Sequence, residues 1–418
     1  MKKNKKEVIS SNIKKNLFWN AFGSFTYLFC QWLLTLIVVR LSSDLHDPGN
    51  FALAMTVSNV FFNLACFNVR PFMVSDTKKE YDVEDYLAFR IITCSIAILI
   101  CFLYTLVFNY TRMQLACIML FLLFKIGEAV TDLFHGLEQR KDRMDIGGIS
   151  LFSRGIISLL VFSISYYLFN NLALSLLLIV VASYIFVIAY DYPIILKFEK
   201  LKIHINSSKV KKLFLYLFPL AIGTFLGTFT TSLPRQILEK LCGIDSLGIY
   251  ATIATPAVII QMAATYIYNP FLLSFANHNK ENDMDKFVKL FLKITLFIVL
   301  LSVAGIIGSI LFARILLLIL YGEKIAKYSY LFLLIAVLTS LTGYMWFCHN
   351  ILIVLRKIKS ILLINVSGFA ITVLLSSTFI KLFDMNGVSI VLILSTCVMI
   401  IEMLIVIIRE IQKKYNKL

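Results

Sequence analysis

The chain has 418 residues, of which 59% are hydrophobic and only 15% are charged, and its formal net charge at pH 7 is +16. Soluble domains are about half apolar and about a quarter charged, so this composition excludes an ordinary soluble globular protein. It indicates a chain that lies mostly within a membrane.

Twelve apolar runs follow one another along the chain. Each has about the 20 residues that a helix needs to cross a bilayer, and none shows the alternation typical of membrane β-strands. We therefore predict an all-α polytopic membrane protein with about twelve transmembrane helices. The expected spans are 17–39, 50–73, 86–108, 113–134, 149–169, 172–195, 213–233, 247–275, 288–312, 328–353, 358–380 and 387–408. A further apolar stretch, 313–321, is too short to span and is expected to form an interfacial or re-entrant piece.

Basic residues are unevenly distributed between the two sides of the expected membrane. When the N-terminus is placed inside, thirty of the 40 lysines and arginines fall on cytoplasmic segments and eight on outer segments. Such an excess is typical of cytoplasmic loops. The pattern predicts a multi-pass protein with both termini in the cytoplasm, and it accounts for the net charge without a nucleic-acid partner.

Sequence motifs for catalysis are missing. The N-terminal lysines precede an apolar run that is too long for a signal peptide, so we expect an uncleaved first span. The eight cysteines show no C-x-x-C spacing, which argues against a zinc site or a disulfide framework. The chain also contains no P-loop, G-x-S-x-G or H-E-x-x-H motif. We predict that the protein is not an enzyme and that it needs no cofactor or metal.

The sixth connection, from Lys197 to Lys212, is the longest and most charged, and it divides the spans six and six. A short echo relates the two parts at an offset of 199 residues: Gly49, Pro71, Phe72 and Ser75 recur as Gly248, Pro270, Phe271 and Ser274. A few such matches also arise by chance in apolar sequence. As a true repeat, the echo predicts two six-helix bundles, 1–200 and 201–418, which face the same way around a central cleft that can open to either side.

The fourth span contains a stripe of charge. Lys125, Glu128 and Asp132 are spaced so that all three lie on one face of a helix, and His135 continues that face. Ionisable side chains in spans usually face the bundle interior or a wet cavity. The stripe is a candidate site for a charged substrate or a coupling ion. Alternatively, Lys125 and Glu128 form an internal pair that only holds helices together.

Other charged residues in or beside the spans are further candidates. Arg70 and Arg154 lie near span ends, where each either faces inward or extends to the interface. Arg40 ends the first span at the expected outer mouth. Asp191 and Glu402 are candidate ion-coupling residues, because burial favours the protonated form of a carboxyl group. For Glu402, a structural contact with a polar neighbour is the alternative.

Local signatures support a family resemblance. The first span opens with Asn16-Leu17-Phe18-Trp19-Asn20-Ala21 and closes at Arg40, shortly before Gly49 and Phe51. After the fourth span come Gln139-Arg140, Arg143-Met144-Asp145, Ser150 and Arg154-Gly155. Together with the length and the twelve paired spans, they make the whole chain resemble the Wzx-type polysaccharide flippases of the multidrug/oligosaccharidyl-lipid/polysaccharide exporter superfamily. The signatures are loose, so the resemblance rests on the ensemble.

The resemblance implies a function in a bacterial inner membrane. Such proteins move undecaprenyl-pyrophosphate-linked oligosaccharide repeat units from the cytoplasmic to the outer leaflet, for O-antigen, capsule or other surface polysaccharide. The polysaccharide polymerase and chain-length machinery would then be partners, besides membrane lipid. The expected substrate-binding residues are Arg70, Lys125, Arg154 and Arg40, and the expected residues for H⁺ or Na⁺ coupling are Glu128, Asp132, Asp191 and Glu402. The alternative is an ion-coupled multidrug or cation antiporter of the same superfamily, which would favour a cavity of net negative charge.

Overall fold

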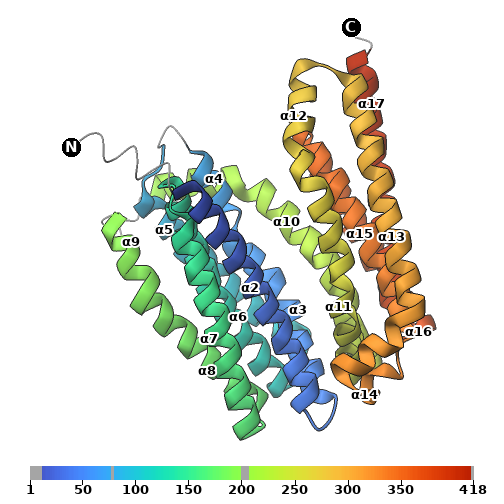
Figure 1. The fold of residues 1–418 in the computed structure, drawn as a ribbon. Helices are drawn as coiled ribbons and strands as arrows, with labels where there is room; N and C mark the ends of the chain where they lie inside the picture. The colour runs from blue at the N-terminus through green and yellow to red at the C-terminus, as the bar shows by residue number, and fades with distance from the viewer. Residues whose placement is uncertain (1–11, 77–79, 199–206, 416–418) are drawn as a thin grey trace. The chain divides into compact units, whose positions relative to one another are not determined.

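A computed structural model describes residues 12–76, 80–198 and 207–415 (Figure 1). All regular structure within these ranges is helical. Twelve of the helices found there are long and apolar enough to cross a membrane, which confirms the predicted all-α membrane class. Part of the predicted orientation and division rests on residues that lie outside the described ranges, namely the first four N-terminal lysines and residues 199–206 of the sixth connection.

The chain forms two compact units, Met1–Phe225 and Leu226–Leu418. Their boundary lies inside α10 (Ser207–Cys242), so the first unit includes the start of the helix that we expect to open the second half. Besides that part of α10, the first unit contains α2 (Asn12–Leu41), α3 (His46–Cys66), α4 (Val69–Ser75), α5 (Val83–Val107), α6 (Arg112–Arg140), α7 (Met144–Phe169), α8 (Leu172–Phe186), the π-helix η1 (Val187–Asp191) and α9 (Tyr192–Phe198). The second contains the rest of α10, α11 (Ile244–Tyr268), the 3₁₀-helix η2 (Asn269–Phe271), α12 (Leu272–Glu281), α13 (Met284–Tyr321), α14 (Glu323–Ala326), α15 (Leu331–Val354), α16 (Ile358–Phe383) and α17 (Met385–Tyr415).

Helices α2 and α7 pack with their backbones in contact. A Cβ atom added to Gly148 would overlap the carbonyl group of Trp19, and one added to Gly23 would overlap the carbonyl oxygen of Gly148. Small residues allow such an approach in membranes, where packing rather than water exclusion drives helix association. The two glycines therefore fix the spacing of this helix pair.

Helix α6 is longer than its apolar run. It begins with a capping box, in which the hydroxyl of Thr111 accepts from the backbone N–H of Gln114 and the Gln114 side chain accepts from that of Thr111. We expected the span to end at 134, but the helix continues to Arg140. Its last four residues, Leu-Glu-Gln-Arg, are good helix formers. Glu138 and Gln139 are consequently helical and not part of a loop.

The second unit corrects one prediction. Residues 313–321 do not form a separate interfacial or re-entrant piece, because α13 runs unbroken through them to Tyr321. No proline or glycine interrupts that stretch, and the helix ends only at Gly322, whose φ is 81°. With 38 residues, α13 is roughly 57 Å long at 1.5 Å per residue.

Both units interrupt a helix just before one of the echoed prolines. In the first, α3 ends at Cys66 and the chain turns through Phe67 and Asn68, whose φ angles are 49° and 54°. Pro71 then lies in the first turn of α4, where the missing N–H costs little. In the second unit, α11 passes into η2, which contains Pro270. The two interruptions thus adjoin Pro71 and Pro270, which the offset of 199 relates.

Candidate functional site

The charged stripe on α6 is largely paired within the first unit. The Lys125 ammonium donates to both carboxylate oxygens of Glu128, at 3.1 and 3.0 Å, and lies 5.6 Å from the centre of the Phe62 ring. Tyr27 of α2 donates a hydrogen bond to the same carboxylate. The structure therefore shows the internal pair that we gave as the alternative, and a role of Lys125 in substrate binding stays a prediction.

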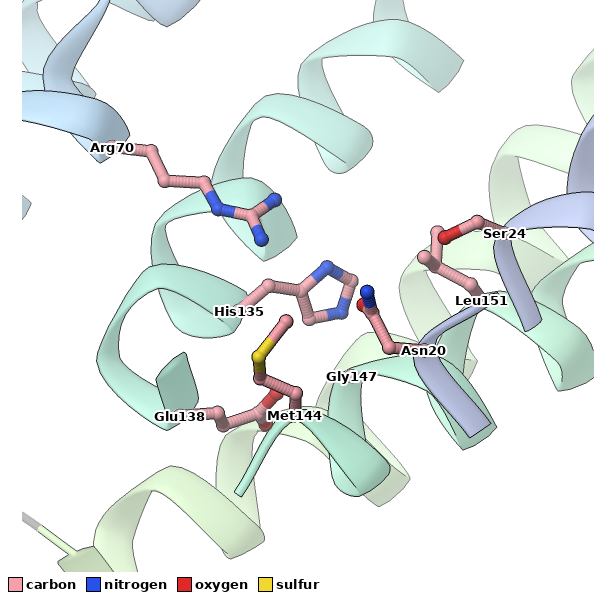
Figure 2. A pocket seen from close by; sticks show the side chains of 8 residues that line it. All are labelled: Asn20, Ser24, Arg70, His135, Glu138, Met144, Gly147 and Leu151. Atoms are coloured by element: carbon pink, nitrogen blue, oxygen red, sulfur yellow. The ribbon is translucent and has the colours of Figure 1, made fainter. Parts of the chain in front are cut away.

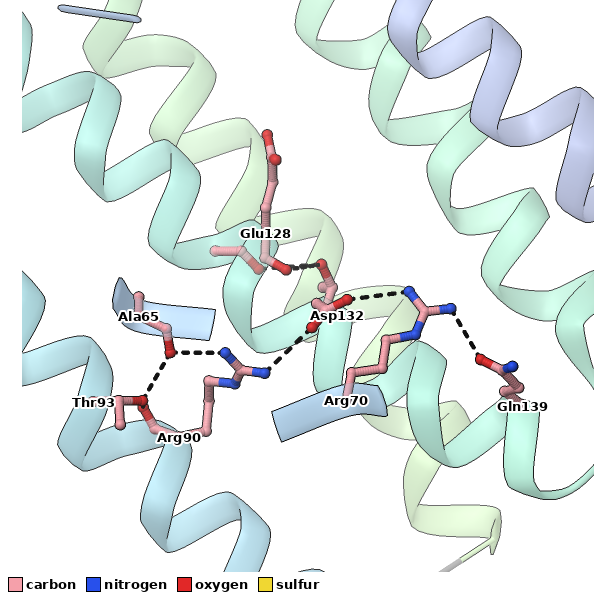
Figure 3. A network of polar contacts seen from close by, with 9 residues as sticks. Ala65, Arg70, Arg90, Thr93, Glu128, Asp132 and Gln139 are labelled. Carbon is pink, nitrogen blue, oxygen red and sulfur yellow. Dashed lines mark hydrogen bonds and ion pairs between the residues drawn. The ribbon is translucent and has the colours of Figure 1, made fainter. Parts of the chain in front are cut away.

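Asp132 connects three helices (Figure 3). One carboxylate oxygen accepts from Arg70 of α4 at 3.1 Å, and the other accepts from Arg90 of α5 at 3.3 Å. Arg70 also donates to the side chain of Gln139 at 3.3 Å. Two guanidinium groups thus share one carboxylate, and this cluster carries one positive charge in excess.

The Arg90 side chain is only 1% exposed. Its second terminal nitrogen donates to the backbone carbonyl of Ala65 at 2.8 Å, and the hydroxyl of Thr93 donates to the same oxygen at 2.8 Å. The last carbonyls of a helix lack partners within it, and Ala65 lies in the last turn of α3. Arg90 therefore also caps the helix that ends at the turn before α4.

Arg154 is buried, so the structure shows the inward orientation of the two that we gave for it. From α7 it donates to the hydroxyl of Thr131 on α6 and, at 3.2 Å, to that of Ser183 on α8. These partners are neutral, and its charge is not matched by a hydrogen-bonded carboxylate. Arg154 therefore brings a further positive charge into the interior of the first unit.

A polar cavity of about 180 Å³ lies beside this network. It opens between α2, α4, α6 and α7, and the His135 ring points into it between Arg70 and Asn20 (Figure 2). Its lining residues are Asn20, Ser24, Arg70, His135, Glu138, Met144, Gly147 and Leu151. Such a volume corresponds to roughly six water molecules at about 30 Å³ each, so the cavity can hold water or a polar group of comparable size.

The carboxylate of Asp76, which follows α4, binds residues just before and at the start of α5. Asp76 accepts from the backbone N–H of Glu80 and of Tyr81 and from the hydroxyl of Tyr86, at 3.1, 3.3 and 3.0 Å. Partial burial acts to raise the pKa of Asp76, but these hydrogen bonds together lower it below its ordinary value. Asp76 thus stays ionised and holds the residues just before α5 in place.

The remaining predicted residues are dispersed. Arg40 lies exposed at the end of α2. Asp191 is buried at the end of the π-helix η1. Glu402 lies in the second unit, where it accepts a hydrogen bond of 2.6 Å from Ser367, which is the polar contact given as its alternative role. Of the eight predicted residues, Arg70 contacts Asp132 and Lys125 contacts Glu128.

Sequence reasoning missed Arg90 and Glu138. Arg90 lies inside the third apolar run, but its place near the run's end led us to group it with the preceding loop. Glu138 follows the apolar part of α6, so we assigned it to the loop after the fourth span. Extending α6 beyond its apolar part would have placed Glu138 one helical turn after His135.

Structural comparison defines the class of the protein. The chain superposes on the lipid II flippase MurJ with a TM-score of 0.75 at 11% identity, over 94% of this chain and 89% of MurJ. For a multidrug resistance MATE family transporter of the MOP superfamily, the TM-score is 0.73 at 10% identity, over 92% of this chain and 95% of the transporter. The protein is thus a multi-pass membrane protein with the fold of the MATE and MurJ transporters.

Sequence comparison defines the family. The model described as polysaccharide biosynthesis protein matches residues 15–272, and the chain belongs to this family. The capsular polysaccharide biosynthesis protein CapF of Staphylococcus aureus is 27% identical over 323 residues, which cover 75% of this chain and 80% of CapF. The resemblance to polysaccharide flippases is thereby confirmed at the level of family and fold.

Proposed function

We propose that the protein is a flippase for a lipid-linked oligosaccharide of surface polysaccharide assembly. In this proposal it moves undecaprenyl-pyrophosphate-linked repeat units from the cytoplasmic to the outer leaflet of a bacterial inner membrane, with both of its own termini in the cytoplasm. The family membership and the likeness to CapF support the assignment to polysaccharide assembly. Polymerase and chain-length proteins would receive the product.

The observation that carries the proposal is the excess positive charge of the cluster formed by Arg70, Asp132 and Arg90. A pyrophosphate needs cationic donors, and guanidinium groups bind phosphate oxygens in a bidentate manner. Arg70 is the accessible member, because its side chain is 31% exposed and borders the polar cavity. The lipid tail would stay in the bilayer, and the internal echo supports an alternating-access movement of two similar halves.

Replacing Arg70 with alanine in a host that lacks its own flippase tests the proposal. Arg314→Ala is the matched control, because Arg314 is exposed and pairs only with exposed Glu323 at 3.3 Å among the contacts described. We expect R70A to abolish most surface polysaccharide at normal protein level, and lipid-linked precursor to accumulate in the cytoplasmic leaflet. R314A should keep normal surface polysaccharide and should not accumulate the precursor. Normal polysaccharide in R70A would contradict the assignment of Arg70.

The antiporter alternative predicts a different result. A strain that expresses the protein would export cationic dyes or drugs in exchange for H⁺ or Na⁺, and surface polysaccharide would not depend on it. Mixed charge in the first unit favours the anionic substrate instead. Efflux measured in the same strains, together with uptake of labelled lipid-linked sugar into vesicles under an imposed gradient, separates the two functions and tests coupling through Glu128, Asp132 and Glu402.

A further inference from the structure

Polar atoms without a partner line the cavity of the first unit. Glu138 is 0% exposed and His135 is 7% exposed, and both side chains line the cavity. Neither oxygen of the Glu138 carboxylate makes a hydrogen bond within the described part of the chain, and Nε2 of His135 makes none there either. Buried polar atoms are normally hydrogen-bonded, so these three atoms indicate a polar ligand that the cavity takes up.

Two glycines bring the charged ends of the cavity close to His135. A Cβ atom added to Gly147 would lie 2.9 Å from a carboxylate oxygen of Glu138 and 3.0 Å from a ring carbon of His135, so both side chains meet at one backbone position. A Cβ atom added to Gly136 would lie 3.1 Å from Cγ of Arg70, whose stem therefore packs against α6 beside His135. Figure 2 shows the His135 ring between Arg70 and Glu138.

The two ends of the cavity have opposite hydrogen-bonding character. A guanidinium group only donates hydrogen bonds, whereas an ionised carboxylate only accepts them. Arg70 therefore suits phosphate oxygens, but Glu138 would repel them and needs a partner that carries O–H or N–H groups. Asn20 and Ser24 of α2 add an amide and a hydroxyl to the lining, and both groups can donate as well as accept. A ligand that suits both ends has acceptor oxygens on one side and donor groups on the other.

A phosphate attached to a sugar has this pattern. The phosphate oxygens are acceptors, and the adjoining sugar ring carries several hydroxyl donors. Met144 and Leu151 supply apolar lining, which suits the C–H face of a sugar ring. The volume of about 180 Å³ equals that of roughly six water molecules, a space comparable to a single sugar ring. A cationic ligand would suit Glu138 but would be repelled by Arg70.

We propose that the cavity is a subsite for the first sugar of the carried lipid, the one attached to the pyrophosphate. Glu138 accepts hydrogen bonds from hydroxyl or amide groups of this sugar, and Arg70 holds the adjacent phosphate. A carrier lipid without sugar would leave Glu138 unpaired, and sites built to bind a hydroxyl reject analogues that lack it. Glu138 is thereby a specificity-determining residue. This inference rests on the proposed function and adds which part of the substrate is recognised.

Binding of two lipids to the purified protein in nanodiscs tests the proposal. One is the lipid-linked repeat unit that accumulates in a host strain lacking this protein, and the other is undecaprenyl pyrophosphate without sugar. We expect the wild type to bind the repeat unit at least about tenfold more tightly. In Glu138→Gln, affinity for the repeat unit should fall by about this factor, whereas affinity for the sugar-free lipid should not fall. Arg70→Ala should weaken the binding of both lipids and leave their ratio unchanged.

Glu410→Gln is the matched control, because Glu410 pairs with Lys357 in the second unit, and it should bind both lipids as the wild type does. Ser24→Ala removes a hydroxyl from the cavity without a change of charge and should weaken only the binding of the repeat unit. Circular dichroism establishes that each variant is folded.

The possible failures are distinguishable. Equal binding of the two lipids by the wild type, or an unchanged preference in E138Q, would overturn the sugar subsite and leave the flippase assignment standing. Binding of neither lipid would overturn the proposed function itself. Binding of a cationic dye that depends on Glu138 would overturn the subsite in favour of a cation site.

Discussion

Arg90 and Asp132 form an ion pair of 3.3 Å although the arginine side chain is almost completely buried. A buried charge of this kind is expensive unless it is fully paired. The pair therefore separates the two arginines by role: Arg90 is held in the interior by Asp132 and the end of α3, whereas Arg70 retains access to the cavity.

Replacing Arg90 with alanine should destabilise the protein by on the order of 3 kcal/mol, because it removes a buried ion pair and a helix cap together. Arg70→Ala should cost less than about 1 kcal/mol, because the Arg70 pair is half-exposed and Asp132 retains Arg90. Reversible unfolding in mixed micelles measures both. Equal losses in the two variants would refute this division of roles.

Replacing Gly148 with alanine should separate α2 from α7, because the new methyl group meets backbone atoms of Trp19 that no rotamer change can move. We expect a loss of about 1–3 kcal/mol, as for other overpacked cores. Gly308→Ala is the control, since nothing lies within 4 Å of its added Cβ atom. That change should be neutral or stabilise α13 by up to about 1 kcal/mol. A tolerated G148A would disprove the backbone contact.

Replacing Gly147 with alanine should affect function more than stability. Its Cβ atom would lie 2.9 Å from an Oε atom of Glu138 and 3.0 Å from a ring carbon of His135, and both are ends of flexible side chains. Moving them into the cavity should lower transport on the order of tenfold, equivalent to about 1.4 kcal/mol, with little change in unfolding. Surface polysaccharide and precursor flipping are the measurements. Full activity would show that the cavity is not used.

Acid should weaken the hydrogen bonds that Asp76 accepts from Glu80, Tyr81 and Tyr86. Because hydrogen bonds lower the pKa of Asp76 in the folded protein, its stabilising contribution is complete above the ordinary carboxyl pKa and is lost as the pH falls through the lowered value. The unfolding free energies of the wild type and of Asp76→Asn should differ most at about pH 7, well above the ordinary carboxyl pKa, and should approach each other as the pH falls through the lowered pKa of Asp76. A constant difference between the two would contradict the assignment.

The sequence allowed the twelve helices to be predicted, because hydropathy is a local property and each span carries its own signal. It also predicted the stripe on α6, since helical spacing alone brings Lys125, Glu128 and Asp132 to one face. Their partners could not be predicted in the same way. Whether Arg90 or Arg154 points inward depends on neighbours distant in the chain, namely Ala65 for one and Ser183 for the other.

The glycine contact between α2 and α7 has a mechanical consequence. Tyr27 of α2 and Arg154 of α7 each donate a hydrogen bond to α6, to Glu128 and Thr131. Because α2 and α7 touch along their backbones, neither can shift far without carrying the other. A displacement of this pair would therefore release both donors from α6 in one step. We therefore expect α2 and α7 to move as one rigid pair, whose position against α6 is fixed by these two hydrogen bonds.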